Sequence, residues 1–156
     1  MKETAVERKE KKSSPARGHL LADEESGPRI AIVDDEPQIA SLFSVLLKRD
    51  GFKVIGLFSN GMELLQSLEN AKNVSERATL KQSLPDIVVL DYMMPELDGV
   101  ETAKRLKAKY PGVKIIMVSA YSLTSYESGE RYFDAYIKKP ASVKQLLSVI
   151  TSLCGT

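Results

Sequence analysis

Short, uninterrupted runs of apolar residues recur along this chain and alternate with longer stretches of helical spacing. A strand is continuously apolar, rather than alternately apolar and polar, when neighbouring elements cover both of its faces. Runs of this kind occupy residues 30–33, 54–58, 87–90 and 113–118, with a weaker one at 135–137. The pattern predicts a doubly wound α/β domain in three layers, in which helices cover both faces of a five-stranded parallel sheet.

The segments between the apolar runs carry signals for the start and the end of helices. Pro37 suits the first turn of a helix, and Gly51 stands where that helix must stop. Other helices are predicted from Met62 and after the N-caps Asp98 and Ser142, each cap being followed three residues later by Glu or Gln. The apolar stripe of the first helix consists of Ile39, Leu42, Phe43, Leu46 and Leu47.

The overall composition excludes several classes of protein. The chain has 156 residues, the size of one domain, and its formal net charge of +1 gives no field that would hold nucleic acid. A single cysteine, Cys154, cannot form an internal disulfide, which fits a reducing compartment. No apolar run approaches the roughly 20 residues of a membrane span, and the polar N-terminus lacks a signal peptide's apolar stretch. We expect a soluble, cytoplasmic protein that binds neither nucleic acid nor membrane.

Residues 1–28 differ in composition from the rest of the chain. They are rich in Lys, Arg, Glu and Ser, contain little that a core would bury, and end in helix-breaking residues. Such a segment cannot offset its ordering entropy, so we expect a disordered charged tail over 1–28 and the folded domain over 29–156. We interpret the tail as a solubilising extension in preference to a docking arm.

Polar side chains follow four of the five apolar runs. Asp34 and Asp35 follow the first run, Asp91 the third, Ser119 the fourth, and Lys139 comes just after the fifth. In an open α/β sheet the ligand site lies beyond the carboxyl ends of the strands, where the winding direction reverses. In the flavodoxin-like strand order 2-1-3-4-5 this point falls between the first and third strands, so the three aspartates are predicted to converge there.

Three neighbouring carboxylates repel one another, and burial would raise their proton affinities unless cations compensate. The ammonium of Lys139 and a bound divalent ion are the two candidate cations. An all-oxygen site with room for waters suits Mg²⁺. Asp91 could then attack a phosphoryl group, while Mg²⁺, Lys139 and Ser119 share the charge on its oxygens.

Each of these residues also has a purely structural interpretation. Asp34 and Asp35 could only cap the first helix, and Lys139 could form a solvated pair with Lys138. Tyr136, in the last apolar run, could serve only in packing. Capping does not explain why almost every strand end carries such a group, so the functional interpretation is favoured.

The sequence from residue 88 to residue 99 reads Val-Val-Leu-Asp-Tyr-Met-Met-Pro-Glu-Leu-Asp-Gly. With the aspartate pair at 34–35, the serine at 119 and Lys139-Pro140, it resembles the receiver domain of two-component response regulators, of the single-domain chemotaxis-regulator type. The parts occur in the family's order, and the resemblance extends from about Arg29 to the C-terminus. Each part alone is a weak signal, but the set is highly specific. The resemblance implies the flavodoxin-like receiver fold.

The resemblance implies a role for each residue of the acidic set. Asp91 is the phosphoacceptor by this likeness. Mg²⁺ would be bound directly by Asp35, mainly through water by Asp34, and also by Asp91 and the backbone carbonyl of Met93. Lys139 would pair with Asp91 and then with the phosphoryl group.

The resemblance also implies a switch. Ser119 would help Lys139 to stabilise the phosphoryl group, and Ser119 and Tyr136 correspond to a pair in which the hydroxyl moves toward the phosphate and the ring turns inward. The Lys139-Pro140 peptide bond corresponds to one that is cis in the family, which would aim the lysine into the site. An added charge of about −1.5 to −2 could then bias a two-state surface.

Three features depart from the family's pattern. Residues 70–85 are longer than compact receivers need, which predicts an elongated appendage on one edge. Residues 122–133 lack the small glycine-alanine pair common before the fifth strand, so the fourth helix and the usual output face could be altered. Ala141 follows Pro140 where the family often has an aromatic residue.

Two bulky side chains, Met93 and Tyr121, occupy positions that flank the family's path of water to the phosphorylated residue. We hypothesise that their bulk slows hydrolysis and prolongs the signal. Met93 and its neighbour Met94 are otherwise expected to plug the loop and the adjoining core, with only the Met93 carbonyl functional.

The leading interpretation is a stand-alone phosphoacceptor, because only Cys154-Gly155-Thr156 follow the last helix. We expect a histidine kinase, a phosphotransfer protein or a small phosphodonor as the phosphoryl source, and a downstream protein as the target. The expected state is a monomer or a weak, phosphorylation-linked homodimer.

Two other functions were weighed against this one. A phosphorylation-independent pseudo-receiver, acting as an interaction module, has no need of the full acidic set and Lys139. A phosphatase with an aspartyl intermediate generally needs an acid two residues after the nucleophile, where Met93 stands. We therefore do not expect a turnover enzyme.

Overall fold

The apolar runs form one parallel sheet with the strand order β2-β1-β3-β4-β5. The strands are β1 (Arg29–Val33), β2 (Lys53–Phe58), β3 (Ile87–Asp91), β4 (Lys114–Ser119) and β5 (Ala135–Lys138). The helices are α3 (Pro37–Arg49), α4 (Gly61–Val74), α6 (Gly99–Lys109) and α7 (Val143–Leu153). The predicted fold class and strand order are confirmed by this computed structural model.

The structure describes residues 27–74, 84–121 and 132–154. Most of the predicted tail at 1–28 therefore lies outside the described residues. The same holds for much of the predicted appendage at 70–85 and for nearly all of residues 122–133, where an altered fourth helix was expected. Within the described ranges, helix α4 continues to Val74, beyond the apolar residues from which it was predicted. No helix among those described has the length and apolar character needed to cross a membrane.

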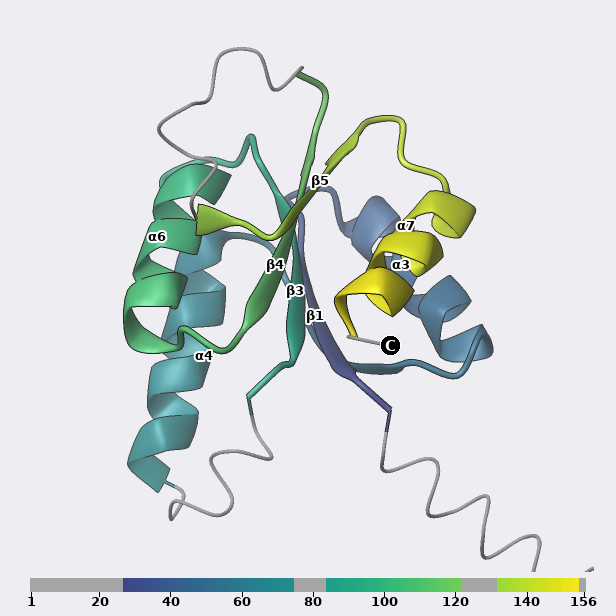
Figure 1. The fold of residues 1–156 in the computed structure, drawn as a ribbon. Helices are drawn as coiled ribbons and strands as arrows, with labels where there is room; N and C mark the ends of the chain where they lie inside the picture. The colour runs from purple at the N-terminus through teal and green to yellow at the C-terminus, as the bar shows by residue number, and fades with distance from the viewer. Residues whose placement is uncertain (1–26, 75–83, 122–131, 155–156) are drawn as a thin grey trace, which may run out of the picture.

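Successive residues of the inner strands belong to two apolar clusters on opposite faces of the sheet. In β1, Ile30 and Ile32 join a cluster with residues of α3 and α7, whereas Ala31 and Val33 join one with residues of α4 and α6. Figure 1 shows these two pairs of helices on either side of the sheet. Burial on both faces explains why the inner strands are continuously apolar, and β3 is buried along its whole length.

The edge of the sheet is less buried than the sequence predicts. Strand β2 pairs only with β1, and its residues alternate between exposed and half-buried, with Ile55 and Leu57 among the exposed ones. In the predicted stripe of α3, Phe43 and Leu47 are buried, whereas Leu42 is 52% exposed. The expectation that helices cover both faces of each strand is therefore wrong for β2, which pairs only with β1 in the part of the chain that the structure describes.

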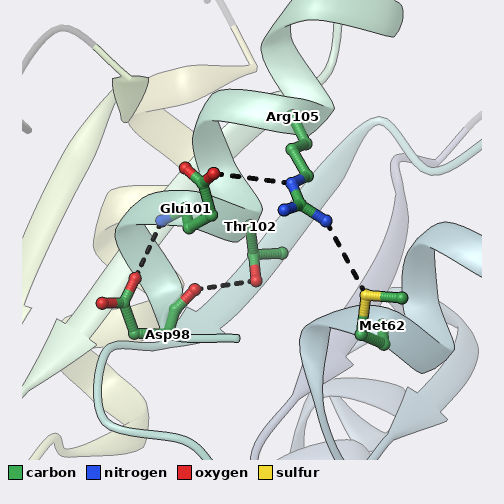
Figure 2. A network of polar contacts seen from close by, with 5 residues as sticks. All are labelled: Met62, Asp98, Glu101, Thr102 and Arg105. Carbon is green, nitrogen blue, oxygen red and sulfur yellow. Dashed lines mark hydrogen bonds and ion pairs between the residues drawn. The ribbon is translucent and has the colours of Figure 1, made fainter. Parts of the chain in front are cut away.

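Helix α6 starts immediately after the loop that follows β3, and its first turn is held as predicted. The Asp98 carboxylate accepts a hydrogen bond from the Glu101 amide at 2.8 Å, and the Thr102 hydroxyl donates to the Asp98 carbonyl at 2.8 Å (Figure 2). Arg105 lies 3.6 Å from Glu101 and donates to the Met62 sulfur of α4 at 3.9 Å (Figure 2). The network joins the two helices that cover one face of the sheet.

Other predicted helix boundaries are also confirmed. Pro37 lies in the first turn of α3, and Gly51 follows that helix with a φ of +93°, a left-handed conformation that favours glycine. Ser142 caps α7, where its side chain accepts a hydrogen bond from the Gln145 amide at 3.1 Å. Pro37 and Ser142 thus begin helices shortly after β1 and β5, and Gly51 ends α3 before β2 begins.

Candidate functional site

The carboxyl ends of β1, β3, β4 and β5 bring polar side chains to one rim of the sheet. Backbone hydrogen bonds continue the strand pairing past the strand ends. The Asp34 amide donates to a carbonyl of β2 at 3.0 Å, the Tyr92 amide to the Val118 carbonyl at 2.9 Å, and the Lys139 amide to the Ser119 carbonyl at 2.7 Å. The residues that follow the strands are therefore held in register with one another.

The three aspartates predicted to converge lie together. One carboxylate oxygen from each of Asp34, Asp35 and Asp91 lies within 4.8 Å of the other two. Asp34 and Asp91 are buried, whereas Asp35 is exposed. The Asp34 carboxylate also accepts a hydrogen bond from the Glu36 amide at 2.9 Å, which fixes its orientation. The arrangement is an oxygen-rich pocket with one side open to water.

Lys139 closes this acidic cluster from the side of β5. Its Nζ atom lies 3.0 Å from Asp91 Oδ1 and 4.0 Å from Asp34 Oδ2. The Lys139-Pro140 peptide bond is cis. The neighbouring Lys138 is exposed, so the interpretation as a solvated lysine pair fits Lys138 but not Lys139.

The electrostatics of the cluster leave negative charge incompletely compensated. Burial raises the pKa of Asp91 to about 6 and, together with the charge of Asp34, outweighs the hydrogen bond and charge of Lys139. Burial likewise raises the pKa of Asp34, against the hydrogen bond from the Glu36 amide and the charge of Lys139. Desolvation lowers the pKa of Lys139, but Asp91, Asp34 and Glu36 together hold it above its ordinary value. A further cation would be bound favourably here.

Ser119 ends β4, and Tyr136 lies in the neighbouring strand β5. Ser119 is buried, and its Oγ accepts a hydrogen bond from the Tyr121 amide at 3.0 Å, which leaves the hydroxyl hydrogen available for donation. Tyr136 is half-buried, and its ring centroid lies 6.1 Å from that of Phe133. Among the described residues, the buried Tyr136 hydroxyl has no hydrogen-bond partner.

The two methionines in the loop after β3 have side chains in different environments. Met94 is buried in the core, whereas the Met93 side chain is 54% exposed. The prediction that both plug the core is therefore wrong for Met93, because the loop turns that side chain toward solvent. The loop is closed by Gly99, whose amide donates to the Tyr92 carbonyl at 2.8 Å and whose added Cβ would lie 2.6 Å from the Asp91 carbonyl oxygen.

Two contributors to the site were missed by sequence reasoning. Glu36 is a third acidic residue, after Asp91 and Asp34, whose charge raises the pKa of Lys139. The sequence offers a signal for it, because the acidic run of Asp34 and Asp35 continues to Glu36. The second contributor is Gly99, which directly follows the predicted cap Asp98. The close approach of the helix to the Asp91 backbone has no signal in a single sequence beyond the glycine itself.

The fold and the site together define a doubly wound α/β domain with an acidic cluster at the carboxyl edge of its parallel sheet. The family profile described as the response regulator receiver domain matches residues 30–151. The chain therefore belongs to the response regulator receiver family.

Curated relatives of the chain differ in length. The chemotaxis protein CheY of Listeria monocytogenes is 34% identical over 92 residues, which cover 59% of this chain and 67% of CheY. The DNA-binding response regulator MtrA of Mycolicibacterium smegmatis is 30% identical over 125 residues, which cover 77% of this chain and 47% of MtrA. The chain spans about half or less of the length of several of these relatives.

Solved structures agree with the fold. The response regulator TrrA of Thermotoga maritima, in complex with Mg²⁺ and BeF, superposes with a TM-score of 0.67 at 28% identity, covering 81% of this chain and 98% of TrrA. A CheY-like receiver domain protein of Methanospirillum hungatei superposes with a TM-score of 0.66 at 26% identity, covering 81% of this chain and 93% of that one.

Proposed function

We propose that Asp91 accepts a phosphoryl group in a reaction that depends on Mg²⁺, and that the phosphorylated domain signals through contacts with another protein. The observation that carries this proposal is the position of Lys139 Nζ, which lies 3.0 Å from Asp91 Oδ1. Asp91 in turn belongs to a cluster of three aspartates whose carboxylate oxygens lie within 4.8 Å of one another. Helix capping would need no lysine at this place, whereas phosphoryl transfer needs both a nucleophilic oxygen and a cation next to it.

The proposed reaction moves a phosphoryl group from a donor to one carboxylate oxygen of Asp91. That oxygen attacks phosphorus, the bond from phosphorus to the leaving group breaks, and the leaving group departs with the bonding electrons. The product is a mixed anhydride, so the donor must itself carry a labile phosphorus–nitrogen or phosphorus–oxygen bond. The proposed donors are accordingly a phosphohistidine, on a histidine kinase or phosphotransfer protein, and small acyl phosphates.

Two side chains are positioned to stabilise the transferred group. The Lys139 ammonium, already beside Asp91, would donate hydrogen bonds to the phosphoryl oxygens. Ser119 would donate its hydroxyl hydrogen, because its Oγ already accepts the backbone hydrogen bond from Tyr121. Donors held in place before the reaction are effective because they cost no reorganisation when charge develops.

The donor set suits Mg²⁺. Asp34, Asp35 and Asp91 would hold the ion, with the Met93 backbone carbonyl as a further ligand proposed from the family resemblance. All are hard oxygen ligands, and the exposed Asp35 leaves room for the waters that Mg²⁺ retains. The raised pKa values of Asp34 and Asp91 also indicate negative charge that a divalent cation would compensate. When bound, Mg²⁺ would act as a Lewis acid toward the phosphoryl oxygens.

The proposed output is a rearrangement around Ser119 and Tyr136. Phosphorylation adds a charge of about −1.5 to −2 at Asp91, beside Lys139, and Ser119 would respond to that charge with its hydroxyl. Movement of the Tyr136 ring would alter the surface around β5, which a downstream protein would read. We also infer that the domain is not a turnover enzyme, because the Met93 side chain has no proton to donate to a leaving group.

Intact mass measurement tests the proposal. The wild-type chain is incubated with Mg²⁺ and acetyl phosphate, beside Asp91→Asn and the matched control Asp50→Asn, which changes an aspartate at the end of α3. We expect a phosphate adduct on wild type and Asp50→Asn, none on Asp91→Asn, and none on any chain in excess EDTA. An equal adduct on Asp91→Asn, or no adduct on folded wild type with Mg²⁺, would contradict the proposal.

A further inference from the structure

A cavity of about 470 Å³ opens beside the acidic cluster, between α3 and the segment that leads from β5 into α7. Leu42 and Phe43 contribute to its wall from α3, and Ala141 and Val143 contribute from the other side. Apart from Glu36 and Lys139, every residue of its lining is apolar. The cavity is therefore mostly apolar, and its two charged lining residues, Glu36 and Lys139, lie close enough to interact electrostatically.

Lys139 belongs both to the cavity and to the phosphoacceptor site. It lines the cavity, and its Nζ atom lies 3.0 Å from Asp91 Oδ1. Asp91 itself does not line the cavity, but a molecule whose phosphoryl group contacts Lys139 can extend its remaining atoms toward the apolar walls.

Small side chains keep this space open. Ala120 and Ala141 stand in the lining where longer apolar residues would occupy part of the volume, and Leu42 of α3 is 52% exposed. Apolar surface in contact with water is unfavourable, so a ligand with an apolar group would gain free energy by covering it.

We propose that this cavity, which we call the donor pocket, binds the apolar part of a small acyl phosphate, so that aromatic acyl phosphates phosphorylate Asp91 faster than acetyl phosphate does. The proposal rests on the proposed function of Asp91 and names the class of its small donors. Lys139 complements the charge of the donor's phosphoryl group. Glu36, which also lines the pocket, repels an anionic acyl group and so favours a neutral ring.

Benzoyl phosphate illustrates the step. An Asp91 carboxylate oxygen attacks phosphorus, the bond from phosphorus to the bridging oxygen breaks, and benzoate leaves with the bonding electrons. No proton, oxidant or second substrate is required, because one acyl phosphate is exchanged for another. The phenyl ring is buried in the donor pocket, which raises the second-order rate constant for phosphorylation of Asp91 about tenfold relative to acetyl phosphate.

Initial rates of phosphorylation, followed by intact mass, test this preference. Wild type is compared with Ala141→Phe, which fills the donor pocket, and with Leu42→Ser, which removes part of an apolar wall at an exposed position. Ala108→Phe is the matched control, because Ala108 is an exposed residue that lines a separate cavity between α4 and α6. We expect the benzoyl-to-acetyl ratio of the second-order rate constants for phosphorylation to be about ten in wild type and Ala108→Phe. The ratio should fall several-fold in the two pocket variants.

Binding of unreactive analogues gives a second measurement. Phenacylphosphonate should bind to wild type about tenfold more tightly than acetonylphosphonate in calorimetric titration, and Ala141→Phe should remove the difference. Equal rates with both acyl phosphates, or a ratio that Ala141→Phe and Leu42→Ser leave unchanged, would overturn the donor pocket while the proposed function stands. Failure of both donors to modify Asp91 in folded wild type would instead remove the proposed function, and the donor pocket with it.

Discussion

Lys139 Nζ lies 3.0 Å from Asp91 Oδ1, although the two residues follow different strands and are far apart in the sequence. Asp91 ends β3 at the centre of the sheet, and Lys139 follows the edge strand β5. The same ammonium also lies 4.0 Å from Asp34, which follows β1. One cation thus faces two buried carboxylates, and this contact organises the charge of the whole site.

Replacing Lys139 tests that contact. Lys139→Ala should slow phosphorylation by acetyl phosphate by about 100-fold, because a charged donor at the transferring group is lost. Initial rates at saturating Mg²⁺ measure the effect. The matched control is Lys138→Ala, which removes the exposed neighbouring lysine and should leave the rate unchanged. Equal rates in the two variants would mean that Lys139 does not take part in the reaction.

The raised pKa of Asp91 predicts how stability depends on pH in the absence of divalent metal. The pKa is about 6 in the folded protein against an ordinary value of 3.8, so the folded state holds the proton more tightly than the unfolded chain. This contribution to stability is fully present below pH 3.8 and is lost as the pH rises through about 6. From pH 5.0 to pH 7.5, wild type should therefore lose about 1.4 kcal/mol of unfolding free energy relative to Asp91→Asn.

Urea unfolding of both chains in EDTA measures this difference. Only the change in the wild-type-minus-variant difference is interpreted, since other carboxylates titrate in the same range. Mg²⁺ should restore stability at pH 7.5 in wild type more than in Asp91→Asn, because a ligand that binds the folded state stabilises it. A difference that stays constant between the two pH values would contradict the raised pKa.

The close approach of α6 to the Asp91 backbone predicts that Gly99 tolerates no side chain. A Cβ there would lie 2.6 Å from the Asp91 carbonyl oxygen and 2.8 Å from Tyr92 Cα, so the backbone itself must shift. Gly99→Ala should lower the free energy of unfolding by about 1–3 kcal/mol and also slow phosphorylation. Gly112→Ala is the control, because no heavy atom lies within 4 Å of its added Cβ. Equal stabilities of the two variants would refute this reasoning.

The exposed side chains of Met93 and Tyr121 predict a long-lived phosphoryl group. Met93 is 54% exposed and Tyr121 50% exposed, and the Tyr121 ring stands edge-on to Tyr92 with 6.3 Å between centroids. If their bulk restricts attacking water, the double variant Met93→Ser/Tyr121→Ser should lose its phosphoryl group several-fold faster. The decay of the phosphorylated mass after removal of the donor measures this. Met62→Ser, at an exposed methionine on α4, should decay like wild type, and an unchanged lifetime in the double variant would dismiss the hypothesis.

Much of the fold could be predicted because its signals are local. Continuous apolar runs mark strands covered on both faces, and the caps at Asp98 and Ser142 are short-range patterns that the structure confirms. The cap of α4 was missed, although Asn60 accepts a hydrogen bond from the Glu63 amide and Glu63 accepts one from the Ser59 amide. Asn60 stands there in place of the Ser or Thr of the usual capping box, with Glu63 three residues later.

The features that could not be predicted depend on the tertiary arrangement. Apolar sequence does not reveal which strand lies at the edge, so the exposure of Ile55 and Leu57 became visible only in the assembled sheet. The direction of the Met93 side chain and the cavity beside Ala141 likewise depend on how loops from different strands meet. The convergence of Asp91 and Lys139 could be anticipated because parallel strands end at a common edge.

Chemical identification of the phosphorylated residue tests the central claim most directly. Borohydride reduces an aspartyl phosphate to homoserine, so wild type is phosphorylated with Mg²⁺ and acetyl phosphate, reduced, digested and mapped by peptide mass spectrometry. We predict homoserine at position 91, and none when Mg²⁺ or the donor is omitted. Homoserine at position 34 or 35 instead, or at no position in a folded protein, would contradict the assignment of Asp91 as the phosphoacceptor.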